Sequence, residues 1–174
     1  SSPNIISVIE KPRISYTWTN ASGKTLATTA SFTLSPSVVS AGDTLTCTAD
    51  IVDGYGGTDS SSTSVKITNS KPVLAGVTLL PKTATETTTL TCTPGSVSDS
   101  DGDKVTFKYA WNVNGSLLSG AKGPTLTGTD FSKGDKVACV VTPNDGIEDG
   151  TSVTSNAVGI DNTAPAVKTA ILTP

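Results

Sequence analysis

The chain repeats itself at a spacing of about 93 residues, and this repeat constrains its fold more than any other feature. Three landmarks recur: NSKP (69–72) as NTAP (162–165), YTW (16–18) as YAW (109–111), and GDTLTC (42–47) as GDKVAC (134–139). Agreement of three separate landmarks on one offset predicts tandem domains.

The repeat is out of phase with the ends of the sequence. Proline restricts both itself and the residue before it, so the two N-x-x-P stretches indicate boundaries between units. We therefore expect an incomplete unit at 1–70 that lacks its first two strands, and a complete unit at 71–161. Residues 162–174 are expected to form a linker and the first strand of a next repeat. On this interpretation the chain is an excerpt of a longer protein.

Alternation of apolar and polar residues predicts β-strands in the complete unit. Residues 104–113 place Val105, Phe107, Tyr109, Trp111 and Val113 on one face. Asn114-Gly115 is a strong hairpin signal, because both residues tolerate positive φ. Further strands are expected at 73–80, 87–93, 124–128, 135–142 and 151–160. Short strands separated by turns predict an all-β fold of tandem antiparallel β-sandwiches.

Composition excludes several classes of function. The chain has no His, which removes the commonest general base, and aromatic residues are only 5%, too few for a sugar-lining cleft. A formal net charge of −3 argues against nucleic-acid binding, which needs a basic face. The longest apolar stretches, such as 73–80, are far shorter than the roughly 20 residues of a membrane helix. We therefore expect neither an enzyme, nor a nucleic-acid binder, nor a membrane span.

The order Cys92, Trp111, Cys139 resembles the immunoglobulin-like sandwich. SDSDGD at 98–103, followed by YAW, is similar to the D-x-D-G-D…Y-x-W pattern of cadherin-like and polycystic-kidney-disease-type (PKD-like) repeats in large bacterial surface proteins. DNTAP at 161–165 is similar to the D-N-x-P linker of cadherins. The resemblance implies an extracellular or cell-surface, bacterial protein whose repeats act as structural spacers and adhesion modules.

The resemblance also implies a disulfide between Cys92 and Cys139 that packs on Trp111. The alternative is that both cysteines are buried thiols, which pack as small apolar side chains. Cys47 corresponds to Cys139 in the repeat, so its partner is expected on a strand before Ser1. Cys47 is thus expected to be unpaired within this chain, or paired outside it.

An incomplete sandwich exposes a strand edge and an apolar face, and such an edge recruits strands from elsewhere. The upstream part of a longer polypeptide would supply them in cis, whereas another copy would supply them in trans, as in donor-strand fibres. The candidate donor strand comprises Ala166, Val167, Ala170, Ile171 and Leu172. It provides one of the two missing strands.

Clustered carboxylates predict a metal site. Asp99, Asp101 and Asp103 alternate in one loop, and Ca²⁺ requires six to eight oxygen ligands. In an immunoglobulin-like sandwich the loop that carries Asp145 and the incoming segment with Asn69 are expected at the same end. A Ca²⁺ ion there would stiffen the joint between units. The alternative is a set of ordinary polar turns, since Asp-Gly pairs are common turn chemistry.

The sequence therefore predicts a non-catalytic structural repeat module of an extracellular fibre or cell-surface stalk. Its expected partners are further repeats of the same chain or copies of itself. The alternative is an adhesin or carbohydrate-binding module with a glycan or protein ligand. Tyr55, between two glycines, is a candidate contact residue, and Asn20 and Asn114 match the N-glycosylation pattern in what we interpret as hairpin turns.

Overall fold

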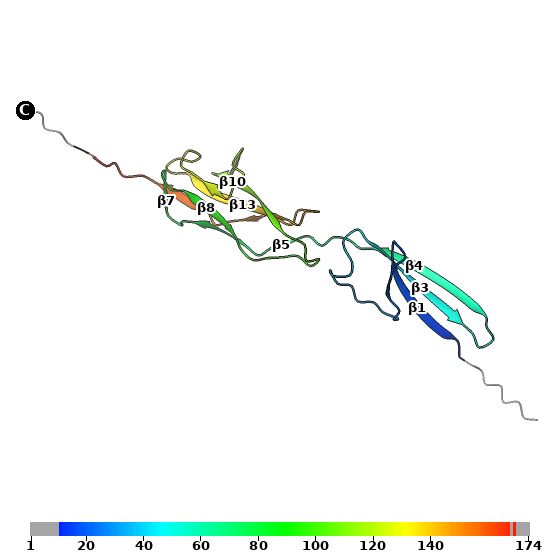
Figure 1. Cartoon of the computed structure of the whole chain (residues 1–174). Helices are drawn as coiled ribbons and strands as arrows, with labels where there is room; N and C mark the ends of the chain where they lie inside the picture. The colour runs from blue at the N-terminus through cyan, green and yellow to red at the C-terminus, as the bar shows by residue number, and fades with distance from the viewer. Residues whose placement is uncertain (1–10, 168, 170–174) are drawn as a thin grey trace, which may run out of the picture. The chain divides into compact units, whose positions relative to one another are not determined.

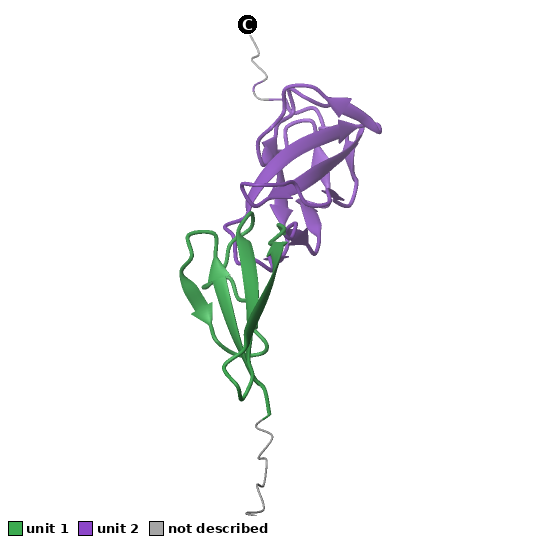
Figure 2. Ribbon diagram, turned by 90° about the vertical axis from the view of Figure 1, so that its right-hand side faces the viewer, with its two compact units in different colours: residues 1–69 green, residues 70–174 purple. Residues whose placement is uncertain are grey.

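All regular structure in the described part of the chain, residues 11–167 and 169, is β-strand (Figure 1). The structure is a computed structural model. Contacts between Cα atoms divide the chain into unit 1, Ser1–Asn69, and unit 2, Ser70–Pro174 (Figure 2).

Unit 1 is a single antiparallel sheet in the order β2-β1-β3-β4. Its strands are β1 (Arg13–Asn20), β2 (Thr25–Ala27), β3 (Thr44–Val52) and β4 (Thr58–Lys66). Side-chain carboxylate and amide groups shape its hairpins. Asn20 Oδ1 accepts hydrogen bonds from the backbone N–H groups of Ser22 and Lys24, and Asp53 Oδ1 does the same for Tyr55 and Gly57.

Unit 2 contains a larger sheet in the order β11-β10-β13-β15-β7, with β14 also beside β13. These strands are β7 (Ala84–Thr85), β10 (Thr106–Val113), β11 (Ser116–Leu118), β13 (Lys136–Asn144), β14 (Val153–Thr154) and β15 (Val158–Asp161). A second sheet has the order β12-β8-β6, and β5 pairs with β9. Their bounds are β5 (Val73–Leu74), β6 (Val77–Leu80), β8 (Leu90–Pro94), β9 (Val97–Ser98) and β12 (Thr125–Leu126).

The apolar faces of these sheets form the core of unit 2 (purple in Figure 2). β10 and β13 contribute the fully buried Trp111, Val137, Cys139 and Val141. The other sheet contributes Leu79, Leu90, Cys92 and Leu126. Alternate residues of each strand point inward, as two packed sheets require. The predicted all-β class, built from antiparallel sheets, is confirmed. The division into one complete and one incomplete immunoglobulin-like domain stays a prediction.

Two predicted strands are each divided in the structure. Residues 73–80 form β5 and β6, because the chain breaks the ladder at Ala75-Gly76 to meet a neighbouring segment. Ala75 N donates to Ser96 O at 2.9 Å, and Gly95 N donates to Gly76 O at 2.8 Å. A Cβ atom on Gly95 would lie 3.1 Å from Gly76 O, so a side chain there would crowd this approach.

Residues 151–160 form β14 and β15, separated by a segment in which the Asn156 side chain acts as a strand partner. Asn156 Oδ1 accepts from Leu79 N at 3.0 Å, and Asn156 Nδ2 donates to Leu79 O at 3.2 Å. The side-chain amide thus makes the same two hydrogen bonds to β6 that the backbone of a neighbouring strand would make. The strand expected at 87–93 begins only at Leu90, because Thr85 and Thr88 form a turn.

Candidate functional site

The acidic loop between β9 and β10 gathers three predicted ligands. One carboxylate oxygen from each of Asp99, Asp101 and Asp103 lies within 4.8 Å of the other two. Asp99 and Asp101 are half-buried, and Asp103 is exposed. Gly102 adopts φ 78°, the left-handed conformation that lets the loop turn back on itself.

Hydrogen bonds hold this cluster in shape. Asp99 Oδ1 accepts from Asp101 N at 2.9 Å and from Asp103 N at 3.2 Å. Asp101 Oδ2 accepts from the backbone N–H of Ser70, the first residue of unit 2, at 2.6 Å. Asp99 Oδ2 is buried and has no hydrogen-bond partner among the described residues. A buried carboxylate oxygen without a donor is costly, so this atom favours a cation nearby.

Asp145, another predicted ligand, is not one of the three carboxylates that lie within 4.8 Å of one another. The metal-ligand roles of Asp145 and Asn69 stay predictions. Asp145 is only 7% exposed, and its Oδ1 accepts from Ile147 N at 2.7 Å and Glu148 N at 2.6 Å. Its carboxylate therefore stabilises the turn between β13 and β14. Asn69 is the last residue of unit 1.

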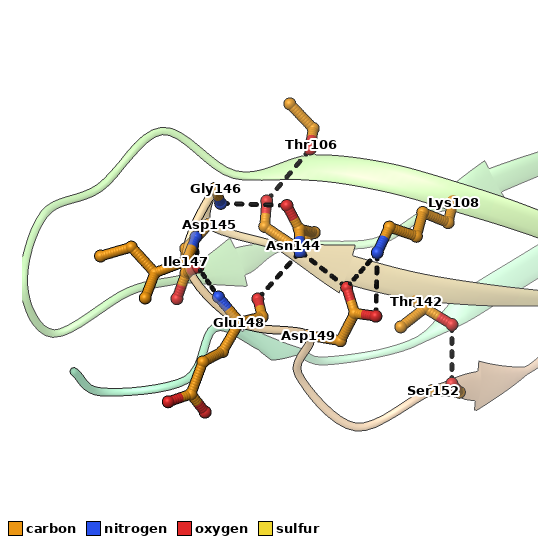
Figure 3. A network of polar contacts seen from close by, with 10 residues as sticks. All are labelled: Thr106, Lys108, Thr142, Asn144, Asp145, Gly146, Ile147, Glu148, Asp149 and Ser152. Carbon is orange, nitrogen blue, oxygen red and sulfur yellow. Dashed lines mark hydrogen bonds and ion pairs between the residues drawn. The ribbon is translucent and has the colours of Figure 1, made fainter.

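The turn after β13 is built from a polar network that also holds Asp149 (Figure 3). Lys108 Nζ, on β10, lies 2.6 Å and 2.9 Å from the two carboxylate oxygens of Asp149. Asn144 Nδ2 donates to Asp149 Oδ1 at 2.7 Å and to Glu148 O at 3.1 Å. The hydrogen bond from Lys108, followed by that from Asn144, lowers the pKa of Asp149 below its ordinary value. Glu148 lies 3.2 Å from Lys71 Nζ.

Sequence reasoning did not single out Lys108 or Ser70. Lys108 is one of several exposed lysines, and only the pairing of β10 with β13 brings it to Asp149. Ser70 stood in the predicted boundary stretch, where nothing in the spacing indicated a bond to a loop about 30 residues later. Side chains that meet across strands depend on register, which the linear pattern does not give.

A disulfide joins the two layers of unit 2. It links Cys92 on β8 to Cys139 on β13, with a Cα–Cα distance of 6.2 Å. Trp111 lies directly opposite Cys139 in the β10–β13 register and is fully buried. Its Nε1 donates to Gly123 O at 2.9 Å. Disulfides persist in oxidising compartments, so this bond fits an extracellular location.

Cys47 is a free cysteine in this chain. It lies on β3 opposite Trp18, as Cys139 lies opposite Trp111 on β13. Trp18 Nε1 donates to Thr29 O at 2.9 Å, which repeats the bond of Trp111. The side chain of Cys47 is half-buried.

The remaining candidates lie at the surface. Ala166 and Val167, the described members of the candidate donor strand, are exposed and belong to no strand, whereas Ala170, Ile171 and Leu172 lie outside the described residues. Tyr55 is 87% exposed in the β3–β4 turn. The Asn20 side chain hydrogen-bonds within its own hairpin. The Asn114 side chain instead donates to Asp135 Oδ1 and accepts from Lys136 N, at the start of β13.

The similarity between this chain and known proteins is weak. No protein-family model and no curated protein matches the chain. A similar solved structure is that of the fibronectin(III)-like modules of Clostridium thermocellum CbhA, at 16% identity over 85% of this chain and 78% of that chain, with a TM-score of 0.33. Within the described residues there is no helix long and apolar enough to cross a membrane.

Proposed function

We propose that this chain is a non-catalytic structural repeat module of a bacterial extracellular fibre or cell-surface stalk. The observation that carries the proposal is the reuse of one framework in both units, with a disulfide across the layers of unit 2. Repetition of one domain type extends a protein in space. The bond that covalently links β8 to β13 limits how far that unit can lengthen under load. Further repeats or other copies would complete unit 1.

Mechanical stretching tests the load-bearing part of this proposal. The disulfide spans a sequence separation of 47 residues, which cannot extend while the bond is intact. At roughly 3.4 Å per residue, reduction should lengthen the unfolding step of unit 2 by about 160 Å. A Cys92→Ala/Cys139→Ala variant should give the long step without reductant. An unfolding step of equal length in both conditions would contradict the mechanical role of the bond.

Location is tested on intact cells of the source organism. Antibodies against unit 2 should bind unpermeabilised cells, and brief external proteolysis should remove the signal while a cytoplasmic marker persists. Detection only after cell lysis would contradict an extracellular role.

The second candidate function, an adhesin or carbohydrate-binding module, is favoured by the exposure of Tyr55. An aromatic ring at a hairpin tip can stack on a ligand, and its neighbours Gly54 and Gly56 leave it unobstructed. A glycan array separates the two functions. The stalk function predicts no binding above background for the wild type. Reproducible binding that Tyr55→Ala abolishes would favour recognition instead.

We further propose that the acidic loop binds Ca²⁺ through Asp99, Asp101 and Asp103. The buried, unpartnered Oδ2 of Asp99 and the proximity of the three carboxylates support this site. Since Asp101 also accepts from Ser70, a bound ion would fix the segment at which the chain enters unit 2. Water and backbone carbonyls would complete the coordination.

Calcium titration tests this site. Three clustered carboxylates suggest a dissociation constant of about 10⁻⁴–10⁻³ M, the range of extracellular modules. Ca²⁺ should raise the melting temperature of unit 2, and Asp99→Asn should abolish the rise. The exposed Asp59→Asn, in unit 1, is the matched control and should leave it unchanged. A melting temperature that neither Ca²⁺ nor chelator alters would exclude the site.

A further inference from the structure

The sheet of unit 1 has two chemically different faces. Residues that share a face alternate along a strand, and register aligns them across strands. Ile14, Tyr16 and Trp18 of β1 pair with Ile51, Ala49 and Cys47 of β3. The opposite face carries mainly Ser and Thr side chains from the same strands. A sheet with one apolar face is built to pack against another layer.

That apolar face is only partly covered, and its Tyr16, Trp18, Cys47 and Ala49 are half-buried. Ile14 is 57% exposed and Ile51 is 36% exposed. Among the described residues of unit 1, the buried apolar side chains are Val39 and Leu45. The Trp18 ring contacts Phe32 with ring centroids 5.8 Å apart, so the loop between β2 and β3 shields part of the face near Trp18. On β4 the same face carries the polar Asp59, Ser61 and Thr63, so its apolar part lies on β1 and β3. An apolar patch that remains partly open marks an interaction surface.

Unit 2 shows what covers the corresponding face. There β6 and β8 lie over β10 and β13 and contribute Leu79, Leu90 and Cys92 to the core. Unit 1 has counterparts of β10 and β13 in β1 and β3, and no second sheet among its described strands. The missing layer is therefore the counterpart of the β6–β8 pair.

Cys47 specifies one property of that missing layer. It occupies the position that Cys139 occupies in unit 2, as the shared register with tryptophan and the matching indole hydrogen bonds show. In unit 2 this position bonds to Cys92, which is on β8. The strand that packs over β3 should accordingly carry a cysteine at the position of Cys92.

We propose that the apolar face of unit 1 is a docking surface for two antiparallel strands of the β6–β8 type from another repeat, and that Cys47 forms a disulfide with a cysteine on the second of these strands. The proposal deepens the structural-module function and rests on it, since the donor is a further repeat of the same kind. Residues 166–174 contain no cysteine, so the candidate donor strand does not satisfy this requirement.

The bond forms by thiol–disulfide exchange. The Cys47 thiolate attacks one sulfur of a disulfide on the incoming strand, a new S–S bond forms, and the other sulfur leaves as a thiolate with the electron pair. No net oxidation occurs in this step, because the incoming disulfide is consumed and a thiol is released. Docking of the strands aligns the two sulfurs and raises their effective concentration.

A peptide with the sequence of residues 73–98 provides the probe. Its cysteine, at the position of Cys92, is activated as a mixed disulfide with 5-thio-2-nitrobenzoate and added to the full chain. The control peptide carries Thr91→Cys and Cys92→Thr, which moves the thiol to the opposite side of the strand. Cys47→Ser protein controls for reaction at other sites.

The matched conjugate is Cys47 disulfide-bonded to the peptide with its cysteine at position 92, and the shifted conjugate is Cys47 bonded to the control peptide. We expect the matched conjugate to resist reduction by glutathione about tenfold better than the shifted conjugate. Hydrogen exchange should slow in β1 and β3 of the matched conjugate alone. Ile51→Ser, on the docking face, should remove most of this advantage while leaving the reaction with a small disulfide unchanged. Ile51 is exposed, so the substitution should not disturb folding.

Equal resistance of the two conjugates, without protection of β1 and β3, would overturn the proposal and leave Cys47 as an accessible thiol. A Cys47–Cys47 dimer that protects the same face would overturn it in favour of a second copy as the occupant. Neither outcome affects the two tests of the structural-module function, which are detection of unit 2 on intact cells and the length of its unfolding step under load. Failure of the stalk function on cells would conversely leave the peptide results intact.

Discussion

Units 1 and 2 share one framework and differ in what covers it. In both units, a strand that carries a tryptophan pairs with a strand that carries a cysteine directly opposite it. The indole N–H donates a hydrogen bond to a backbone carbonyl 11 or 12 residues later in the chain. Leu126 is 2% exposed in unit 2, whereas Leu34, at the same offset that relates Cys47 to Cys139, is 47% exposed. Equivalent residues thus have different energetic roles, because burial depends on the second layer.

The largest expected effect comes from the bond that only unit 2 contains. Cys92→Ala/Cys139→Ala should destabilise unit 2 by about 4 kcal/mol, the chain-entropy cost of opening a loop of this length. Denaturant unfolding followed by tryptophan fluorescence measures this loss of stability. In a Trp18→Phe background the fluorescence comes from Trp111 and therefore reports on unit 2. Cys47→Ala should change the unfolding of this chain by less than about 0.5 kcal/mol. Comparable losses of stability in both variants would show that the disulfide does not distinguish unit 2 from unit 1.

The leucine pair tests burial alone. Leu126→Ala should destabilise unit 2 by about 3 kcal/mol, because it removes a buried side chain and leaves a cavity. Leu34→Ala should cost less than about 1 kcal/mol, since Leu34 is already half in water. Trp18 fluorescence in a Trp111→Phe background follows unit 1. If unit 1 lost as much as unit 2, Leu34 would be buried in solution.

Asn156 hydrogen-bonds to β6, a strand that has no counterpart in the described part of unit 1. Asn156→Ala should destabilise unit 2 by about 1–2 kcal/mol, as two backbone groups of Leu79 lose their partners. Hydrogen exchange at the Leu79 amide should accelerate more than exchange in β13. Unchanged exchange at Leu79 would show that water replaces the amide.

The smallest effect concerns the Lys108–Asp149 pair. A carboxylate with a lowered folded-state pKa contributes stability above its unfolded pKa of about 3.9 and loses it as pH falls through the folded value. Lys108→Met should therefore lower the unfolding midpoint of unit 2 slightly at pH 7, and the difference from wild type should vanish near pH 2. The exposed Lys122→Met should show no such pH dependence. A Lys108→Met deficit that persists at pH 2 would indicate lost packing rather than lost charge.

The sequence predicted most strands and the acidic cluster, because these depend on local order. Alternation from Val105 to Val113 identified β10, and Asp99, Asp101 and Asp103 meet because one loop carries them. The division of the strand at 73–80 was missed, since it depends on the approach of Gly95 to Gly76. The turn-stabilising role of Asp145 was missed for a similar reason, since its Oδ1 accepts from Ile147 N and Glu148 N only once the turn has formed.

Composition, period and spacing are linear properties, so they suffice to predict the all-β class, the repeat and the matching positions of Cys47 and Cys139. Which apolar faces are covered depends on the folded arrangement of the sheets. Cys139 bonds to Cys92 because the two sheets pack face to face, and Lys108 contacts Asp149 because of the strand register. Both pairs join residues that are distant along the chain. Burial is a property of the assembled layers, so the same motif forms a core in unit 2 and a partly open surface in unit 1.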